Sequence, residues 1–250
     1  ADSAPLIDRM PAMTHYRLYY APGACSLAAH IALEEIRLAG LADYASTRLV
    51  LPQGDQKKPE FLAINPRGHV PVLTYRLDGV EGVLTENLAI LKFLTAQHPA
   101  AKLLPASKAD EARAWEWLSW LATDVHSFAF MMVFYPARFA ETLGAQAEVE
   151  AQGRALLARH WADIESRLPD EGYTLGGFSL VDAMLIVFFR WAKRYGFAPQ
   201  RQHPRWTALS ERTMARASVQ AAFEDERINL VDRLPARPAH LLQIPEDAMS

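Results

Sequence analysis

The stretch YRLYYAPGACSLAAHIALEEI, residues 16–36, decides the fold of the first half of this chain. Residues 16–20 are aromatic and apolar and predict a short strand, which Pro22 and the glycine after it bring to an end. The apolar residues that follow recur at helical spacing, so a helix is predicted over 25–36. This strand-turn-helix unit places Cys25, the single cysteine of the chain, at the start of a helix.

The rest of the first half continues the alternation of strands and helices. Further strands are predicted over residues 48–51, 72–75 and 80–84, and helical segments over 59–64 and 86–97. An Asp-Gly turn at 78–79 joins the last two strands in a hairpin, and Thr85 is expected to cap the helix after them. The order β-α-β-α-β-β-α predicts an α/β domain over residues 16–98.

The second half of the chain predicts helices only. The helical patterns cover residues 110–134, 142–168, 180–195, 206–216 and 219–226. We therefore expect an all-helical domain over 110–234, after a linker at 99–109. Ser179 and Asp182 form a variant of the capping box for a helix that is apolar on nearly all sides and belongs in the middle of the core. Residues 1–15 are taken as an N-terminal extension, and residues 235–250 as a Pro-rich tail.

Composition excludes several classes of function. The chain has 250 residues, 50% hydrophobic and 22% charged, with a formal net charge of -3, as in an ordinary soluble protein. Its basic residues are scattered, so we expect neither a nucleic-acid partner nor a membrane partner. The histidines show no paired spacing and only one cysteine is present, so a metal site is not expected. One cysteine cannot close an intrachain disulfide, which makes the cytoplasm the default compartment.

Cys25 is the first candidate for chemistry. The unpaired N–H groups at a helix start stabilise negative charge, so this position favours the reactive thiolate. The alternative is that a free cysteine serves as a small buried hydrophobe. Ala28 stands where a C-x-x-C pair would have its second cysteine, so the thiol must act alone or with an external thiol.

Two further candidates lie near helix and strand starts. The peptide bond before Pro71 enters a strand, where a cis bond would turn the backbone of Val70 toward a ligand; the alternative is an ordinary trans turn. Glu86 and Asn87 open a helix, where N–H groups can receive a carboxylate and Glu86 can receive an amine. The alternative is that Glu86 is only a favourable acid in a first turn.

The first helix of the second half carries the last candidates. Ser119, Thr123 and His126 follow an i, i+4, i+7 spacing and share one face of an α-helix, where they could line a cleft. The alternative is that His126 is a packing residue. The nearby aromatic residues, among them Trp120, are expected to pack in the core or at a subunit interface. The alternative is that they line a hydrophobic substrate pocket.

The segments LYYAPGACSLAAHIALEE (18–35), FLAINPRGHVPVL (61–73) and LTENLAI (84–90) closely resemble the beta-class glutathione transferases. The segments EWLSWLATDVH (116–126) and FSLVDA (178–183) extend this resemblance into the second half. The family implies a thioredoxin-like α/β N-terminal domain, an all-α C-terminal domain and usually a homodimer. It also implies glutathione as the cosubstrate, without a metal.

The resemblance assigns a set of positions to the glutathione site: Cys25, Gln53, Val70, Glu86, Asn87, Ser119, Thr123, Asp124 and His126. It implies that Cys25 faces the glutathione sulfur and that Val70, ahead of a cis proline, pairs with the cysteinyl part. Glu86 and Asn87 would hold the γ-glutamyl end. His126 falls on the histidine near the sulfur, so that Cys25 and His126 are the expected catalytic residues.

The chain departs from the family at two of these places and at a third beside His126. Gln53 lies where some members carry a lysine, Ser119 where they carry an asparagine, and Ser127 where they carry a lysine just after the histidine. The loss of two cations is expected to weaken binding of the glutathione carboxylates or stabilisation of the thiolate.

The leading hypothesis is a glutathione transferase that conjugates or exchanges glutathione with small hydrophobic electrophiles or thiols. The electrophile would lie over the helical domain, near Trp120, His126 and Phe130. The alternative is a noncatalytic relative that uses the same fold for protein contacts or for carrying hydrophobic ligands. The sequence alone does not name the electrophile.

Overall fold

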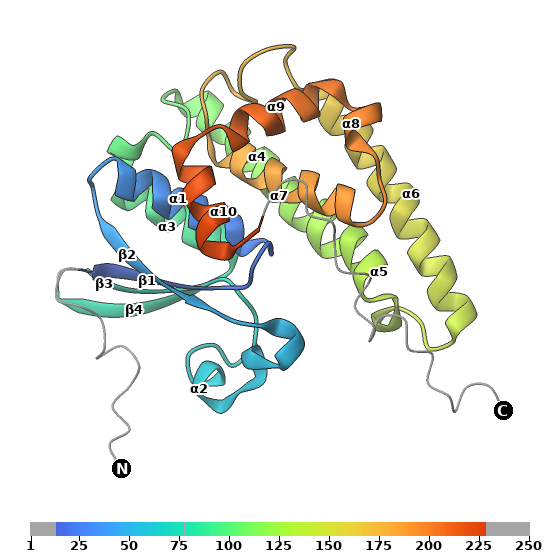
Figure 1. Cartoon of the computed structure of the whole chain (residues 1–250), viewed down its shortest axis with the longest axis horizontal. Helices are drawn as coiled ribbons and strands as arrows, with labels where there is room; N and C mark the ends of the chain where they lie inside the picture. Colours follow the sequence, from blue (N-terminus) through green and yellow to red (C-terminus); the bar gives the residue numbers. More distant parts are fainter. Residues whose placement is uncertain (1–13, 78, 229–250) are drawn as a thin grey trace.

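The computed structural model describes residues 14–77 and 79–228, which form a small sheet domain and a helical domain (Figure 1). The strands are β1 (Thr14–Tyr20), β2 (Asp43–Arg48), β3 (Val72–Leu77) and β4 (Val80–Thr85). The helices are α1 (Ser26–Leu38), α2 (Pro59–Leu62), α3 (Asn87–Gln97), α4 (Lys108–Trp120), the π-helix η5 (Leu121–Phe130), α5 (Met131–Phe134), α6 (Leu143–Arg167), α7 (Leu180–Arg194), α8 (Pro199–Gln202), α9 (Pro204–Met214) and α10 (Ala217–Glu226). Short 3₁₀ turns are η2 (Leu51–Gln53), η3 (Asp55–Lys57), η4 (Pro99–Ala101) and η6 (Pro136–Arg138).

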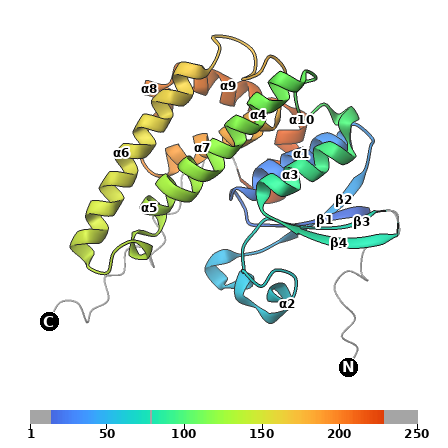
Figure 2. The ribbon, with the colours of Figure 1, turned by 180° about the vertical axis from the view of Figure 1, so that it is seen from behind.

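The sheet has the strand order β2-β1-β3-β4. β1 runs parallel to β2 and antiparallel to β3, and β4 returns antiparallel to β3. Helices α1 and α3 lie side by side on one face of the sheet, and α2 lies on the other (Figures 1 and 2). Because neighbouring side chains of a strand point to opposite faces, Leu18 enters the main core while Tyr19 packs with Phe61 under α2. This is the thioredoxin-like arrangement that the sequence predicts.

The predicted order of elements is confirmed, but the prediction for the second strand is wrong. The strand covers Asp43–Arg48 and not residues 48–51. Apart from Tyr44 and Ala45 its residues are polar, and none of the six is buried, as is common in an edge strand, so the apolar signal is missing. The apolar residue Leu49, which suggested a strand, packs instead in the small cluster with Phe61.

The core of the helical domain is built around α7. Nearly all of its residues are buried, as predicted from their apolar character. Asp182 is fully buried and accepts hydrogen bonds from the Ser179 N–H (2.8 Å) and hydroxyl (3.2 Å), which confirms the capping box. Its second oxygen accepts bonds from the N–H (3.0 Å) and hydroxyl (2.6 Å) of Thr174. The carboxylate therefore fixes both the start of α7 and the segment before it.

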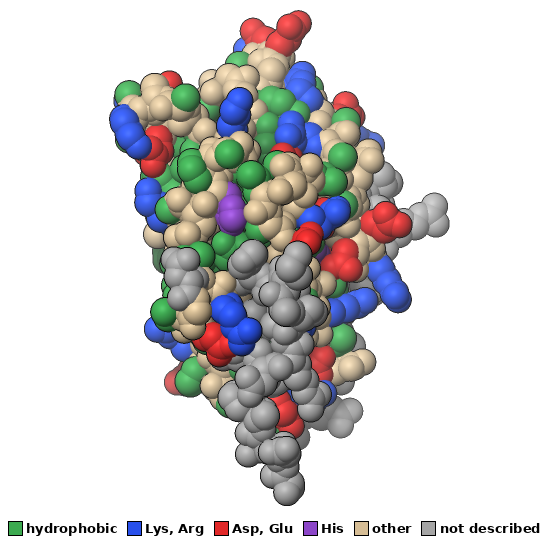
Figure 3. Space-filling view, turned by 90° about the vertical axis from the view of Figure 1, so that its left-hand side faces the viewer, with side chains coloured by type: hydrophobic (Ala, Val, Ile, Leu, Met, Phe, Trp, Pro, Cys, Tyr) green, Lys and Arg blue, Asp and Glu red, His purple; other side chains and the backbone are tan. Residues whose placement is uncertain are grey.

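One end of the molecule exposes apolar side chains. Figure 3 looks onto the end that carries the β3–β4 hairpin, where apolar side chains lie among charged ones. In the edge strand β4, Val80 is 65% exposed and Val83 41%. Leu38, the last residue of α1, and Leu41 are also exposed. Within residues 14–77 and 79–228, no helix is both long enough and apolar enough to cross a membrane.

Helix α6 lies very close to η5 and α5. A Cβ atom added at Gly153 in α6 would lie 2.7 Å from the Met132 Cβ and 3.1 Å from the backbone oxygen of Ala129. Gly153 is buried, so this approach depends on the missing side chain. The absence of a Cβ at this position sets the distance between the two helices.

We predict that Gly153→Ala destabilises the protein, although alanine is ordinarily the better helix former by about 1 kcal/mol. The added methyl group would force apart two backbones that cannot move independently, at a cost of about 1–3 kcal/mol. Thermal unfolding should show a Tm lower by several degrees. The matched control is Gly144→Ala in the same helix, where nothing lies within 4 Å of the new Cβ and Tm should stay equal or rise. Equal effects of both variants would refute the role of Gly153.

Candidate functional site

Three segments of the sheet domain meet at Cys25. The cysteine is the N-cap residue of α1, directly after the turn that ends β1. Its Sγ lies 3.9 Å from the carbonyl oxygen of Val70, in the loop before β3, and donates to it. The Nδ2 of Asn87, at the start of α3, donates to the Cys25 carbonyl oxygen at 3.2 Å. The Val70–Pro71 bond is cis, which confirms the expectation from the resemblance.

The electrostatics of Cys25 differ from the sequence expectation. The N–H groups of Cys25 and Ser26 do lower the pKa of the thiol, as expected at a helix start. Burial acts more strongly in the other direction, and the carboxylates of Glu86 and Glu226 add to it, so the pKa of Cys25 is raised to about 12. The residue retains some exposure to solvent, but in this state it is a neutral thiol and not a thiolate.

The helix start at residues 86–87 also differs from the prediction. Helix α3 begins at Asn87, and its N-cap residue is Glu86, which has a positive φ of 70°. Thr85 ends β4 and does not cap the helix; its hydroxyl accepts a hydrogen bond from Arg67 at 3.1 Å. The same guanidinium lies 3.3 Å from a carboxylate oxygen of Glu86. Arg67 was not singled out from the sequence, because an exposed arginine in a loop gives no signal of its own.

Asn87 offers a polar atom that is left without a bond. Its Nδ2 group donates to Cys25 and lies 3.3 Å from the sulfur of Met184 in α7. Its Oδ1 is buried and has no hydrogen-bond partner among the residues that the structure describes. A buried polar atom of this kind is costly unless a ligand or water satisfies it. Asn87 therefore joins both domains beside Cys25 and keeps one acceptor available.

The long helix of the second half changes its geometry in the region of the predicted site. Residues 121–130 form a π-helix, in which hydrogen bonds span five residues. The side chain of Ser127 follows the same spacing and donates to the Ala122 carbonyl at 2.7 Å. The i, i+4, i+7 spacing therefore no longer places the predicted residues on one face. Such π-helical insertions occur frequently at functional sites.

The π-helix separates His126 from its predicted neighbours. Ser119, Thr123 and Asp124 are exposed, and Thr123 donates to the Ser119 carbonyl at 3.0 Å. The His126 ring is partly buried and lies 5.1 Å from the ring of Trp191 in α7. The expectation that these residues share one face is therefore wrong for His126, which turns inward.

Trp191 connects His126 with the loop before Cys25. Its indole N–H donates to the Gly23 carbonyl at 2.8 Å, two residues before the cysteine. The His126 imidazole packs against Trp191 and Phe188, and burial lowers its pKa to about 4. His126 is consequently neutral near pH 7.

The two residues predicted to form a hydrophobic substrate pocket pack elsewhere. Phe130 is fully buried and stacks on Phe188, with the ring centroids 5.9 Å apart, so it offers no surface to a substrate. Trp120 lies against His160 of α6 at 5.5 Å and against Arg167 at 5.2 Å. Phe130 therefore supports the helical core, whereas Trp120 is partly buried and packs against α6. Gln53, in η2, is exposed, and nothing in the described residues links it to Cys25.

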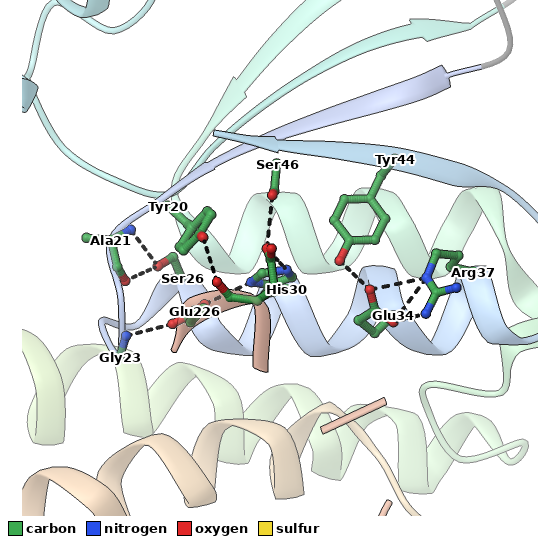
Figure 4. Close-up of polar contacts among 11 residues, drawn as sticks. Tyr20, Ala21, Gly23, Ser26, His30, Glu34, Arg37, Tyr44, Ser46 and Glu226 are labelled. Atoms are coloured by element: carbon green, nitrogen blue, oxygen red, sulfur yellow. Dashed lines mark hydrogen bonds and ion pairs between the residues drawn. The ribbon is translucent and has the colours of Figure 1, made fainter. Parts of the chain in front are cut away.

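A buried polar cluster behind Cys25 was missed in the sequence. The Gly23 N–H donates to a carboxylate oxygen of Glu226 at 2.6 Å, and the other oxygen lies 2.9 Å from Nδ1 of His30 (Figure 4). Both side chains are fully buried. Asp225 extends the cluster, because its carboxylate lies 3.3 Å from Nε2 of His30. His30 and Glu226 are far apart in the chain, so no local motif could reveal the pair. Among the described residues, no group of His, Cys, Asp and Glu is arranged to hold a metal ion.

Comparisons with known proteins agree with this arrangement. A family model described as "Glutathione S-transferase, N-terminal domain" matches residues 23–97, and one described as "Glutathione S-transferase, C-terminal domain" matches residues 146–212. The chain is 34% identical to the glutathione S-transferase GstA of Escherichia coli O157:H7 over 179 residues, which are 70% of this chain and 82% of that protein.

Solved structures extend the likeness over the whole fold. A glutathione transferase homologue from Sulfitobacter with bound glutathione superposes with a TM-score of 0.75 at 31% identity, covering 87% of this chain and all of that one. A beta-class glutathione S-transferase of Sphingomonas chungbukensis superposes with a TM-score of 0.70 at 30% identity, covering 85% of this chain and all of that one. Sequence, fold and the surroundings of Cys25 agree, and the chain belongs to the glutathione S-transferase family.

Proposed function

We propose that this chain is a glutathione transferase of the bacterial beta type, with glutathione bound beside Cys25. The observation that carries the proposal is the meeting of Val70, Asn87 and Cys25, which are the segments that the family resemblance assigns to glutathione. The Sulfitobacter relative contains glutathione in the same fold. The enzyme is a transferase with glutathione as its cosubstrate.

The proposed binding mode follows the chemistry of the tripeptide. The backbone of Val70 pairs with the cysteinyl part, and the carboxylate of Glu86 receives the ammonium group of the γ-glutamyl end. Free N–H groups at the start of α3 receive the adjacent carboxylate. Asn87, whose Oδ1 lacks a partner in the described residues, adds a hydrogen-bond acceptor next to them.

In the proposed reaction the nucleophile is glutathione and not Cys25. The raised pKa of Cys25 keeps it a neutral thiol, which can donate a hydrogen bond to the glutathione thiolate. The thiolate attacks the electrophile, a carbon–sulfur bond forms, and the leaving group departs with the electron pair of its broken bond. Conjugation is thus the main activity, and exchange of thiols through Cys25 is secondary.

The electrophile is a small hydrophobic compound held between the two domains. On the side of the helical domain, Trp191 contacts Gly23 in the loop before Cys25 and packs against His126. We place the enzyme in the cytoplasm, where its single cysteine needs no oxidising environment.

A homodimer completes the proposal. The edge strand β4 exposes Val80 and Val83, which lie on opposite faces of the strand and leave apolar side chains along this edge of the sheet. Exposed apolar surface on an edge strand favours association with another chain. A second copy of this chain is the partner that the family resemblance implies.

The first prediction concerns Cys25 in catalysis. Cys25→Ser keeps a hydrogen-bond donor and should retain conjugation of glutathione with an activated chloronitrobenzene. Cys25→Ala removes the donor and should lower kcat/KM about tenfold or more, because a hydrogen bond to a charged group contributes about 1.5–3 kcal/mol. Both variants should lose thiol exchange with glutathione mixed disulfides. Full loss of conjugation in the serine variant would make Cys25 the nucleophile. If the unmodified protein shows no turnover, the proposed conjugating activity is refuted.

The second prediction concerns His126 and pH. Burial lowers the pKa of this histidine from 6.5 to about 4, so between these values the unfolded chain binds more protons than the folded one. The contribution of His126 to stability is therefore present above pH 6.5 and is lost as the pH falls toward 4. We expect a loss of about 1–3 kcal/mol from this residue, because solvent at its exposed edge screens part of the effect.

The measurement is urea unfolding at pH 7 and at pH 4.5 for the natural protein and for His126→Gln, which does not titrate. The variant should lose less stability on acidification, and the difference between the two proteins isolates His126 from the other buried histidines. An identical pH dependence of both proteins would contradict a buried neutral His126.

The third prediction concerns the dimer. Light scattering should give about twice the mass of the 28.0 kDa chain. The double variant Val80→Glu, Val83→Glu places charge on the exposed apolar surface and should shift the protein toward the monomer. The control is Phe139→Glu, an exposed apolar residue at the far end of the helical domain, which should leave the mass unchanged. A monomeric natural protein would refute the homodimer.

A further inference from the structure

The proposed glutathione site lacks two of its expected cations. Gln53 and Ser127 stand where relatives of the beta class carry lysines, and the structure places both on exposed surfaces. Glutathione carries two carboxylates and one ammonium group, so a site with Glu86 as its acid still needs positive charge. Arg67 supplies a guanidinium next to Glu86.

The position of Arg67 is fixed by its loop. The buried side chain of Asn65 donates to the His69 carbonyl at 2.8 Å and accepts from the Arg67 N–H at 3.2 Å. The Gly68 N–H closes the same turn on the Asn65 carbonyl at 2.9 Å. These bonds hold the backbone of Arg67 in one conformation, just ahead of Val70. The loop that is proposed to pair with the cysteinyl part of glutathione therefore also carries the arginine.

The side chain of Arg67 spans two adjacent residues at the end of β4. Its Nη1 lies 3.1 Å from the hydroxyl of Thr85 and 3.3 Å from a carboxylate oxygen of Glu86. The two charged side chains are 63% and 72% exposed, so the ion pair contributes little to the stability of the fold and remains open to a ligand. Glu86 has a positive φ, which is unusual for a residue other than glycine and is often found at functional sites.

We propose that Arg67, together with the N–H groups at the start of α3, binds the α-carboxylate of the γ-glutamyl group and is a specificity-determining residue of the site. Arg67 and Glu86 present opposite charges 3.3 Å apart, which matches the carboxylate and the ammonium group on one carbon of an amino acid. A guanidinium binds a carboxylate through two parallel hydrogen bonds, so one ligand oxygen can take each N–H while Glu86 turns to the ammonium. The inference rests on the proposed function and names the group that replaces the missing lysines.

The test compares two ligands by titration calorimetry: glutathione, and γ-aminobutyryl-cysteinyl-glycine, which lacks only the α-carboxylate. Arg67→Gln should weaken glutathione binding about tenfold or more and change binding of the analogue less than twofold. Arg67→Lys should restore part of the affinity for glutathione, because lysine keeps the charge but not the paired geometry. The matched control is Arg76→Gln, which removes an exposed arginine paired with Glu81 in the same hairpin and should leave both affinities unchanged.

The outcomes separate the two proposals. If the natural protein binds glutathione and Arg67→Gln weakens both ligands equally, or neither, the role of Arg67 is overturned while the glutathione site stands. If the natural protein binds neither ligand, the proposed function itself is overturned. Circular dichroism and Tm of each variant show whether a loss of affinity comes from unfolding.

Discussion

The buried carboxylate of Glu226 is the contact on which the geometry of the site depends. It accepts the Gly23 N–H and faces His30, so the last described helix, α10, holds the loop that leads into α1. A buried carboxylate is costly unless its oxygens are paired, and here both have partners. A residue of the helical domain therefore holds this loop in place. The position of Cys25 depends on this contact between the domains as well as on strand β1, which precedes it.

Trp191 holds the same loop from a second direction. Its N–H binds the Gly23 carbonyl while Glu226 binds the Gly23 N–H, so both backbone groups of one glycine are tied to the helical domain. The ring of Trp191 also packs against His126 in the π-helix. In this altered helical geometry His126 packs against Trp191, whereas Thr123 is exposed. His126 is thus connected to the loop before Cys25 indirectly, through the ring of Trp191.

Local features of this fold could be predicted from the sequence, and long-range ones could not. The turn at Pro22 and Gly23, the capping of α7 by Asp182 and the cis bond before Pro71 follow from short segments and from a family resemblance. The polar edge strand Asp43–Arg48 has no apolar alternation to reveal it. The π-helix has no sequence signature, so the burial of Phe130 in the core could not be predicted and the sequence assigns the residue to a pocket. The pairing of His30 with Glu226 depends on the packing of α10 against α1.

The sign of the charge around Cys25 explains why the ligand should supply the thiolate. Glu226 organises the loop and Glu86 faces the proposed γ-glutamyl position, and both carboxylates raise the pKa of Cys25. These two acids oppose negative charge on the Cys25 sulfur. On the proposed function, glutathione brings an ammonium group to Glu86 and thereby cancels part of that opposition. Binding of the cosubstrate then prepares the site for the thiolate, while Glu86 keeps its role of recognising the amine.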